Sequence, residues 1–179
     1  MIKNINPLTC LSCKLGKLEL IYDFGQLPLV NSYFTKEEIH KEELFPLELY
    51  YCSSCWLVQL SYFPNPKKMY NEYHHVSGAS KGNVDHLNNF SAYLKNIGGN
   101  RKSVLEIGSN DNTLVKNLSN LGYKCLAVDP AKNLNSEMEN TISQFFNLDM
   151  AKKLESEGKF FDIIIGLNVF ANNDTFIDM

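Results

Sequence analysis

No stretch of this sequence is both apolar enough and long enough to cross a membrane. The longest nearly apolar runs have about seven residues, whereas a membrane-spanning helix needs about 20. Residues 1–10, MIKNINPLTC, also lack the apolar core of a secretory signal. We therefore expect a cytoplasmic protein that has no membrane partner, in a reducing compartment where disulfides are disfavoured.

An excess of positive charge is also absent. Lys and Arg number 17 against 20 Asp and Glu, a formal net charge of -3, and no basic cluster stands out. Proteins that bind nucleic acid or anionic membranes through charge present a basic face, so the composition argues against both partners. With 44% hydrophobic residues, the 179-residue chain suits one domain, or one domain with a small satellite.

Residue composition and hydrophobic pattern divide the chain into three parts. Residues 1–70 hold four of the five cysteines and five of the six prolines, a pattern of short strands and loops. Residues 71–100 are expected to form a linker and then a helix, because apolar residues recur at helical spacing up to Gly98 and Gly99. Residues 101–179 alternate apolar strands with helices. The strands expected in the first part cover 18–25, 27–34, 45–52 and 56–63.

The alternation after residue 101 predicts a parallel sheet. Strands that are apolar on both faces and alternate with helices are typical of parallel sheets covered on both sides. The predicted fold is therefore α/β, preceded by a small four-cysteine domain. The expected strands are 103–107, 124–128, 143–146 and 161–167, and the later helices are 131–140 and 149–157.

Four cysteines form two CxxC pairs, Cys10 with Cys13 and Cys52 with Cys55. This spacing lets two thiolates reach one ion, and two pairs complete the tetrahedral shell that zinc favours. The intervening segment is longer than in a simple zinc ribbon, so it must be a structured insertion or part of a larger fold. A closed shell makes the zinc structural; free thiols or a redox pair are the alternatives. Cys125 lies in an apolar strand and is expected to pack there.

The turn after the first strand of the sheet has one glycine. Residues 108–113 read Gly-Ser-Asn-Asp-Asn-Thr, so the dinucleotide pattern GxGxxG is missing. Gly108 allows close approach of a ligand, and Asp129, at the end of the next strand, is placed to bind a ribose diol. Glu106 and Asp111 would repel a pyrophosphate and favour a sulfonium cation. These residues favour S-adenosylmethionine over NAD or FAD, with an ordinary strand-to-helix turn as the alternative.

Seven motifs run in order through both parts of the chain. They are CLSC, FGQLPLVNSYF, FPLELYYCSSCWLVQL, MYNEYHHVSGAS, VLEIGSNDNTLV, AVDPA and DIIIGLNVFANND. Together they resemble the nucleotide-sugar C-methyltransferases. The resemblance implies that 1–70 is a zinc-binding domain and that 101–179 is the N-terminal half of a class I, Rossmann-like S-adenosylmethionine domain.

The resemblance also implies an activity, the transfer of a methyl group to a carbon of a nucleotide-linked deoxy-keto sugar, in polysaccharide biosynthesis. Such a carbon becomes nucleophilic only after a base removes a proton beside the ketone and the enolate oxygen is stabilised. By resemblance, Tyr73 and His75 face the sugar. The residues implied on the cofactor side are Glu106, Gly108, Asn110, Asp111, Asp129, Pro130, Phe146 (at the adenine) and Asn168.

Two residues and the length depart from the family pattern. Asn112 stands at the second glycine of the loop, and asparagine is among the few other residues that tolerate φ > 0. Asn172 stands where the family has histidine, and asparagine cannot serve as a general base at neutral pH. The family sheet has strand order 3-2-1-4-5-7-6, of which this chain supplies only 3-2-1-4.

In that arrangement the strand over 161–167 is an exposed edge. It is apolar and lacks the lysine or proline residues that normally blunt an edge. We therefore expect the isolated chain to be poorly stable, and to self-associate or take up a complementing fragment along this edge. The alternative function is a non-catalytic, zinc-stabilised interaction or regulatory module.

Overall fold

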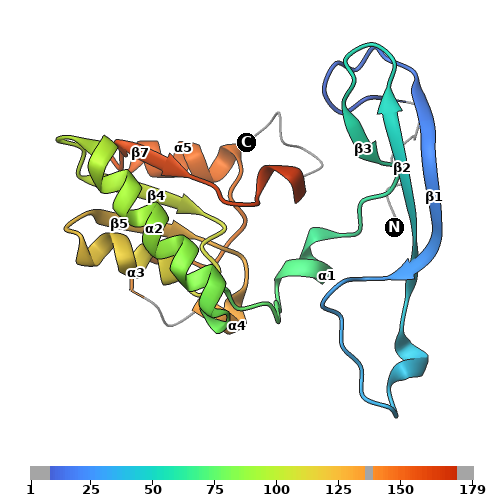
Figure 1. Ribbon diagram of the computed structural model, residues 1–179, viewed down its shortest axis with the longest axis horizontal. Helices are drawn as coiled ribbons and strands as arrows, with labels where there is room; N and C mark the ends of the chain where they lie inside the picture. Colours follow the sequence, from blue (N-terminus) through green and yellow to red (C-terminus); the bar gives the residue numbers. More distant parts are fainter. Residues whose placement is uncertain (1–8, 136–138, 173–179) are drawn as a thin grey trace. The chain divides into compact units, whose positions relative to one another are not determined.

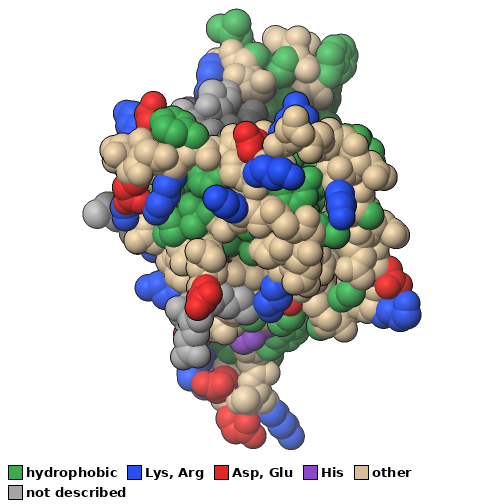
Figure 2. Space-filling view, turned by 90° about the vertical axis from the view of Figure 1, so that its left-hand side faces the viewer, with side chains coloured by type: hydrophobic (Ala, Val, Ile, Leu, Met, Phe, Trp, Pro, Cys, Tyr) green, Lys and Arg blue, Asp and Glu red, His purple; other side chains and the backbone are tan. Residues whose placement is uncertain are grey.

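The computed structural model describes residues 9–135 and 139–172. The chain forms two compact units, Met1–Met69 and Tyr70–Met179, whose elements are labelled in Figure 1. In the described ranges, no helix combines the length and the apolar character that crossing a bilayer requires. On the face drawn in Figure 2, lysine and arginine side chains lie apart from one another, among acidic, polar and hydrophobic groups.

The N-terminal unit contains a three-stranded antiparallel sheet. Its strands, in spatial order, are β1 (Leu18–Pro28), β2 (Leu44–Cys52) and β3 (Val58–Leu60). β1 and β2 pair from Leu18 opposite Cys52 to Pro28 opposite Leu44, and the 3-10 helix η1 (Ile39–Lys41) lies in their connection. This register brings the start of β1 beside the second cysteine pair.

The strand expected over 27–34 is wrong. β1 instead continues through Gly25, with a register irregularity between Asp23 and Gln26. Gly25 has φ +81° and its N–H donates to the Asp23 carboxylate at 2.7 Å, so the bulge is a local turn that does not end the strand. β1 ends at Pro28, which has no N–H to extend the ladder, and the chain then turns at Asn31 with φ +62°.

The C-terminal unit contains the predicted parallel sheet, in the order β6-β5-β4-β7. Counted along the unit, this order is the 3-2-1-4 that the resemblance implied. The central strand pairs on both sides, Leu105 with Leu126 on β5 and with Ile164 on β7. The α/β fold class is thus confirmed. The strands are β4 (Ser103–Ile107), β5 (Lys124–Val128), β6 (Thr141–Ile142) and β7 (Ile163–Ile165).

Helices cover both faces of this sheet. Successive side chains of β4 point to opposite faces, so each face contributes its own apolar residues to a core. Val104 packs with leucines of α2 and α3 on one face, and Leu105 and Ile107 pack with Met150 and Leu154 of α5 on the other. The helices of the unit are α2 (Lys81–Gly98), α3 (Thr113–Asn120), α4 (Lys132–Asn135) and α5 (Leu148–Ser156) (Figure 1). Shorter elements are α1 (Pro66–Tyr70), which ends at the first residue of the unit, and the 3-10 helices η2 (Ser77–Ala79) and η3 (Phe170–Asn172).

The third strand of the sheet lies two residues earlier than the expected 143–146. The N–H of Ala127 donates to the carbonyl of Asn140, and that of Asp129 to the carbonyl of Ile142. These two bonds pair the end of β5 with residues up to Ile142, so the described residues after Ile142 do not pair with β5. Of the helix expected over 131–140, Lys132–Asn135 is observed, and residues 136–138 lie outside the described ranges.

Candidate functional site

The four predicted metal ligands come together in the N-terminal unit. Their sulfur atoms all lie within 4.8 Å of one another; Cys10 and Cys55 are 3.5 Å apart, and Cys13 and Cys52 are 3.6 Å apart. A tetrahedral zinc site with Zn–S bonds of about 2.3 Å separates its sulfurs by about 3.8 Å. The cysteines are free, so the cluster fits one zinc ion whose four positions are all filled by protein.

Both cysteine pairs are held by the same backbone turn. The N–H of Lys14 donates to the carbonyl of Cys10 at 3.2 Å, and the N–H of Trp56 donates to the carbonyl of Cys52 at 2.9 Å. Lys14 and Trp56 both have left-handed backbone, with φ of +59° and +63°. Each turn therefore directs two thiols to the same side, as a metal site requires.

Backbone amides stabilise the thiolate form of Cys13. Hydrogen bonds from the backbone N–H groups of Leu15 and Gly16 lower the pKa of its thiol to about 6. Gly16 is also a functional residue that sequence reasoning missed. A Cβ atom there would lie 2.0 Å from the sulfur of Cys52, so any side chain would intrude on the ligand cluster. The available signal was a glycine three residues after a CxxC pair.

The loop after β4 adopts left-handed backbone at three positions. Gly108, Asn110 and Asn112 have φ of +73°, +55° and +61°. A Cβ on Gly108 would lie 2.6 Å from the side chain of Val169, so this position requires glycine for space as well as for conformation. The conformation expected for Asn112 is present, which explains how asparagine replaces a glycine there.

Glu106 is a buried carboxyl with an unsatisfied oxygen. Its side chain is 4% exposed and its Oε2 has no hydrogen-bond partner among the described residues. Burial, followed by the charges of Asp129 and Asp111, raises the pKa of Glu106 to about 8, and the N–H of Val115 opposes this only in part. The two neighbouring carboxylates favour a positive charge at this site and disfavour a negative one.

Asp129 ties together the loops that follow β4 and β5. Its Oδ2 accepts from the N–H of Asn110 at 2.9 Å, and its Oδ1 accepts from the N–H of Ala131 at 2.7 Å. The side chain of Asn135 donates to Oδ1 at 3.1 Å. A carboxylate has about four acceptor positions, so most of the capacity of Asp129 is used within the protein.

Asn110 and Asp111 contact the segment that carries the two predicted substrate residues. The Asn110 side chain accepts from the N–H of Ser77 at 2.8 Å and donates to the carbonyl of His75 at 2.9 Å. Asp111 accepts from the N–H of Gly78 at 2.8 Å. The ring centroids of Tyr73 and His75 are 6.2 Å apart, and those of Tyr73 and Tyr70 are 5.6 Å apart.

The remaining predicted residues lie around the same end of the sheet. Pro130 follows Asp129 directly. Phe146 packs beside the core on the α5 face. Asn168 is exposed after β7 with φ +56°, and its carbonyl accepts a hydrogen bond from the side chain of Asn172 at 2.7 Å. Among the hydrogen bonds of the described residues, none joins Phe146 or Asn168 to the loop of 108–113.

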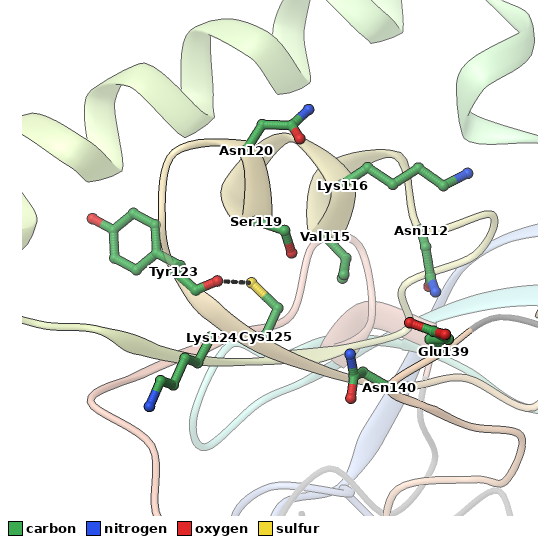
Figure 3. Close-up of a pocket in the computed structure, with 10 residues that line it drawn as sticks. All are labelled: Asn112, Val115, Lys116, Ser119, Asn120, Tyr123, Lys124, Cys125, Glu139 and Asn140. Atoms are coloured by element: carbon green, nitrogen blue, oxygen red, sulfur yellow. Dashed lines mark hydrogen bonds between the residues drawn. The ribbon is translucent and has the colours of Figure 1, made fainter.

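A separate cavity of about 790 Å³ opens beside α3. Figure 3 shows it bounded by α3, the start of β5 and residues 139–140, with the sulfur of Cys125 directed at the carbonyl of Tyr123. Asn112 reaches its edge, but none of the predicted cofactor residues lines it. This cavity is therefore a neighbour of the loop and distinct from the predicted site.

Two comparisons bear on these sites. Residues 10–70 match a protein-family model described as "Putative zinc binding domain". The chain is 25% identical over 159 residues to the C-methyltransferase NovU of Streptomyces niveus, an alignment that covers 85% of this chain and 38% of that protein. The chain thus spans less than half the length of this relative. Both findings confirm the resemblance that the motifs indicated and support a methyltransferase-related function with a zinc-binding N-terminal unit.

Proposed function

We propose that this chain binds S-adenosylmethionine and forms part of a C-methyltransferase that acts on a nucleotide-linked deoxy-keto sugar. The observation that carries the proposal is the buried Glu106 carboxyl, which lacks a partner for Oε2 and lies in the field of Asp129 and Asp111. A cationic ligand relieves this electrostatic cost, whereas a pyrophosphate would increase it. The similarity to a C-methyltransferase supports the choice of cation.

Residues of the loops after β4 and β5 would hold the cofactor. Gly108 and the left-handed Asn110 and Asn112 bring the backbone to the carboxyl edge of the sheet, where ligands of such folds bind. Asp129 keeps acceptor capacity for a ribose hydroxyl, with Pro130 beside it. When bound, S-adenosylmethionine supplies an electrophilic methyl group.

His75 is the residue proposed to accept the proton next to the sugar ketone. Its imidazole is exposed, and an imidazole is a suitable base near neutral pH. The ring of Tyr73 packs against it, and a phenol can donate a hydrogen bond to a developing enolate oxygen. Asn172 cannot take the proton, and its side chain holds the carbonyl of Asn168.

Zinc has a structural role in this proposal. All four cysteines of the cluster are available as ligands, which leaves no position for substrate or water. The zinc ion would therefore stabilise the N-terminal unit and take no part in methyl transfer.

Calorimetric titration of the full chain with S-adenosylmethionine tests the proposal, with NAD as the control ligand. We expect saturable binding of one S-adenosylmethionine, no binding of NAD, and weaker binding of S-adenosylmethionine by Glu106→Gln. No heat of binding at millimolar cofactor would overturn the proposal. It would favour the second candidate, a non-catalytic zinc-stabilised interaction module, for which the absence of a base at Asn172 is the supporting observation.

A further inference from the structure

Residues 73–78, between α1 and α2, are held in place by side chains from elsewhere in the C-terminal unit. We call this segment the strap. Irregular backbone must still satisfy its N–H and C=O groups, and here six of them bond to side chains. The groups are N–H and C=O of Tyr73 (to Asn133), C=O of His75 and N–H of Ser77 (to Asn110), C=O of Ser77 (to Asn83) and N–H of Gly78 (to Asp111).

Two of these side chains act as matched amide clamps. Asn133 accepts from the N–H of Tyr73 at 3.0 Å and donates to the carbonyl of the same residue at 2.9 Å. Asn110 makes the equivalent pair of bonds with Ser77 and His75. Each clamp uses one donor and one acceptor of a primary amide. An aspartate side chain supplies only acceptors, and an alanine side chain supplies neither group.

The two clamps hold the strap at the backbone of Tyr73 and at the backbone of His75 and Ser77. Asn110 lies in the loop after β4 and Asn133 lies in α4, after β5. Asp129 accepts hydrogen bonds from the backbone of both loops, at Asn110 and at Ala131. The position of the strap is thus linked, through two asparagines and one carboxylate, to the carboxyl edge of the sheet.

We propose that Asn133 is a positioning residue that, together with Asn110, fixes the strap so that the rings of Tyr73 and His75 lie at the cofactor edge of the sheet. The assignment of Tyr73 and His75 to the substrate rests on the proposed function. The clamp itself rests only on the hydrogen bonds described above. Asn133 acts through the backbone of Tyr73, so its own side chain need not touch a ligand.

Asn133→Ala and Asn133→Asp in the full chain test this role, and Asn117→Ala is the matched control. Asn117 also makes an amide bond, to Asn88 at 2.8 Å, but joins α3 to α2 away from the strap. We expect amide exchange in 73–77 to become about fivefold faster or more in Asn133→Ala, and faster by a smaller factor in Asn133→Asp, which keeps the acceptor for the Tyr73 N–H but loses the donor. Asn117→Ala should leave exchange in the strap unchanged.

The imidazole proton signals of His75 provide a second measurement, which general destabilisation would not move selectively. The Tyr73 ring meets His75 edge-on at an interplanar angle of 66°, so release of Tyr73 should shift the His75 signals while those of His40 and His86 stay in place. Unchanged exchange and unchanged His75 signals in Asn133→Ala would overturn the proposal. Wild-type behaviour of Asn133→Asp would overturn the two-bond clamp.

Titration of the same variants with S-adenosylmethionine separates this inference from the proposed function. If the strap loosens in Asn133→Ala and the wild-type chain binds the cofactor, both hold. If the strap loosens and the wild-type chain binds no cofactor, the proposed function fails while the clamp stands. If the strap is unaffected in a chain that binds the cofactor, only the positioning role of Asn133 fails.

Discussion

The side chain of Asn112 donates a hydrogen bond to the hydroxyl of Thr141 across 2.6 Å. This bond links the start of α3 to the short strand β6. Asn112 is 2% exposed and has φ +61°, a conformation that asparagine tolerates better than most residues. The residue thus combines the backbone freedom expected of glycine with a cross-link that glycine cannot make.

Replacement of Asn112 separates these two contributions. Asn112→Gly keeps the left-handed backbone and loses the bond to Thr141, whereas Asn112→Ala loses the bond and adds backbone strain of about 1–2 kcal/mol. We expect Asn112→Ala to have the lower free energy of unfolding in urea and the weaker binding of S-adenosylmethionine. Equal behaviour of the two variants would show that the conformation of Asn112 does not matter for the loop.

The buried carboxyl of Glu106 should make stability depend on pH. Its pKa is about 8 in the folded chain against an ordinary 4.5, so between these values the folded state holds a proton that the unfolded state releases. Stability should therefore fall as the pH rises from 4.5 to 8, by on the order of a few kcal/mol. Urea unfolding of Glu106→Gln between pH 5 and 8 should show a flatter profile.

Glu155→Gln, an exposed change on α5, is the control and should keep the wild-type decline. An equal decline in the Glu106→Gln chain would show that another group is responsible. A bound cation should replace the proton on Glu106, so saturating S-adenosylmethionine should reduce the decline in the wild-type chain and have less effect in Glu106→Gln.

A methyl group at Gly16 should disrupt the metal cluster. Its Cβ would lie 2.0 Å from the sulfur of Cys52 and 3.2 Å from the side chain of Ser54. Zinc affinity of Gly16→Ala, measured by competition with a chromogenic chelator, should fall at least tenfold, or about 1.4 kcal/mol. Gly82→Ala, in α2, is the control, because Gly82 has no positive φ and a Cβ there would meet only the side chain of Ser80, at 3.9 Å. Wild-type affinity in Gly16→Ala would contradict the ligand geometry described above.

Removal of zinc should unfold the N-terminal unit. Its buried apolar cluster consists of Cys10, Leu18 and Cys52, so two of its three members are metal ligands, and structural zinc contributes about 10–16 kcal/mol in small domains. A chelator should remove the part of the β-sheet signal in circular dichroism that β1, β2 and β3 contribute, and added zinc should restore it. Cys125→Ser should still bind one zinc ion. A circular dichroism spectrum that does not change when zinc is removed would contradict a structural role.

The free side of β7 should mediate self-association. Among the described residues β7 pairs only with β4, and Ile164 on this strand is 64% exposed. Ile164→Lys places a charge at the edge, which opposes strand pairing between molecules. Sedimentation velocity should show more monomer for Ile164→Lys than for wild type. Ile39→Lys, at an exposed position of η1, should not change the distribution, and a monomeric wild-type chain would refute the prediction.

The features that were predictable from the sequence are those set by local spacing. A CxxC pair brings two sulfurs together within one turn, so the spacing of Cys10 and Cys13 predicts a ligand pair from the sequence alone. The five-residue strand that ends at Ile107 is apolar on both faces except for Ser103 and Glu106, which indicated a buried parallel strand followed by a ligand loop.

The features that were missed depend on contacts between distant parts of the chain. Asn133 and Tyr73 are 60 residues apart, and neither has a neighbour in sequence that signals the bond. Gly16 matters only because the sulfur of Cys52 lies against it. The position of β6 likewise depends on the pairing of β5 with the carbonyls of Asn140 and Ile142. The short polar segment around these residues does not encode that register.

If Tyr73 and His75 face the substrate as we propose, the strap provides a route by which substrate preference changes. Its clamps hold main-chain atoms at Tyr73, His75 and Ser77, and the side chains of Tyr73 and His75 take no part in these clamp bonds. New side chains at these two positions would be presented at the same place without rebuilding the support. Gly78 is constrained, since a Cβ there would lie 2.7 Å from the Asp111 carboxylate. The fold thereby separates the placement of these two side chains from their chemical identity, and on the proposed function single substitutions here would change specificity.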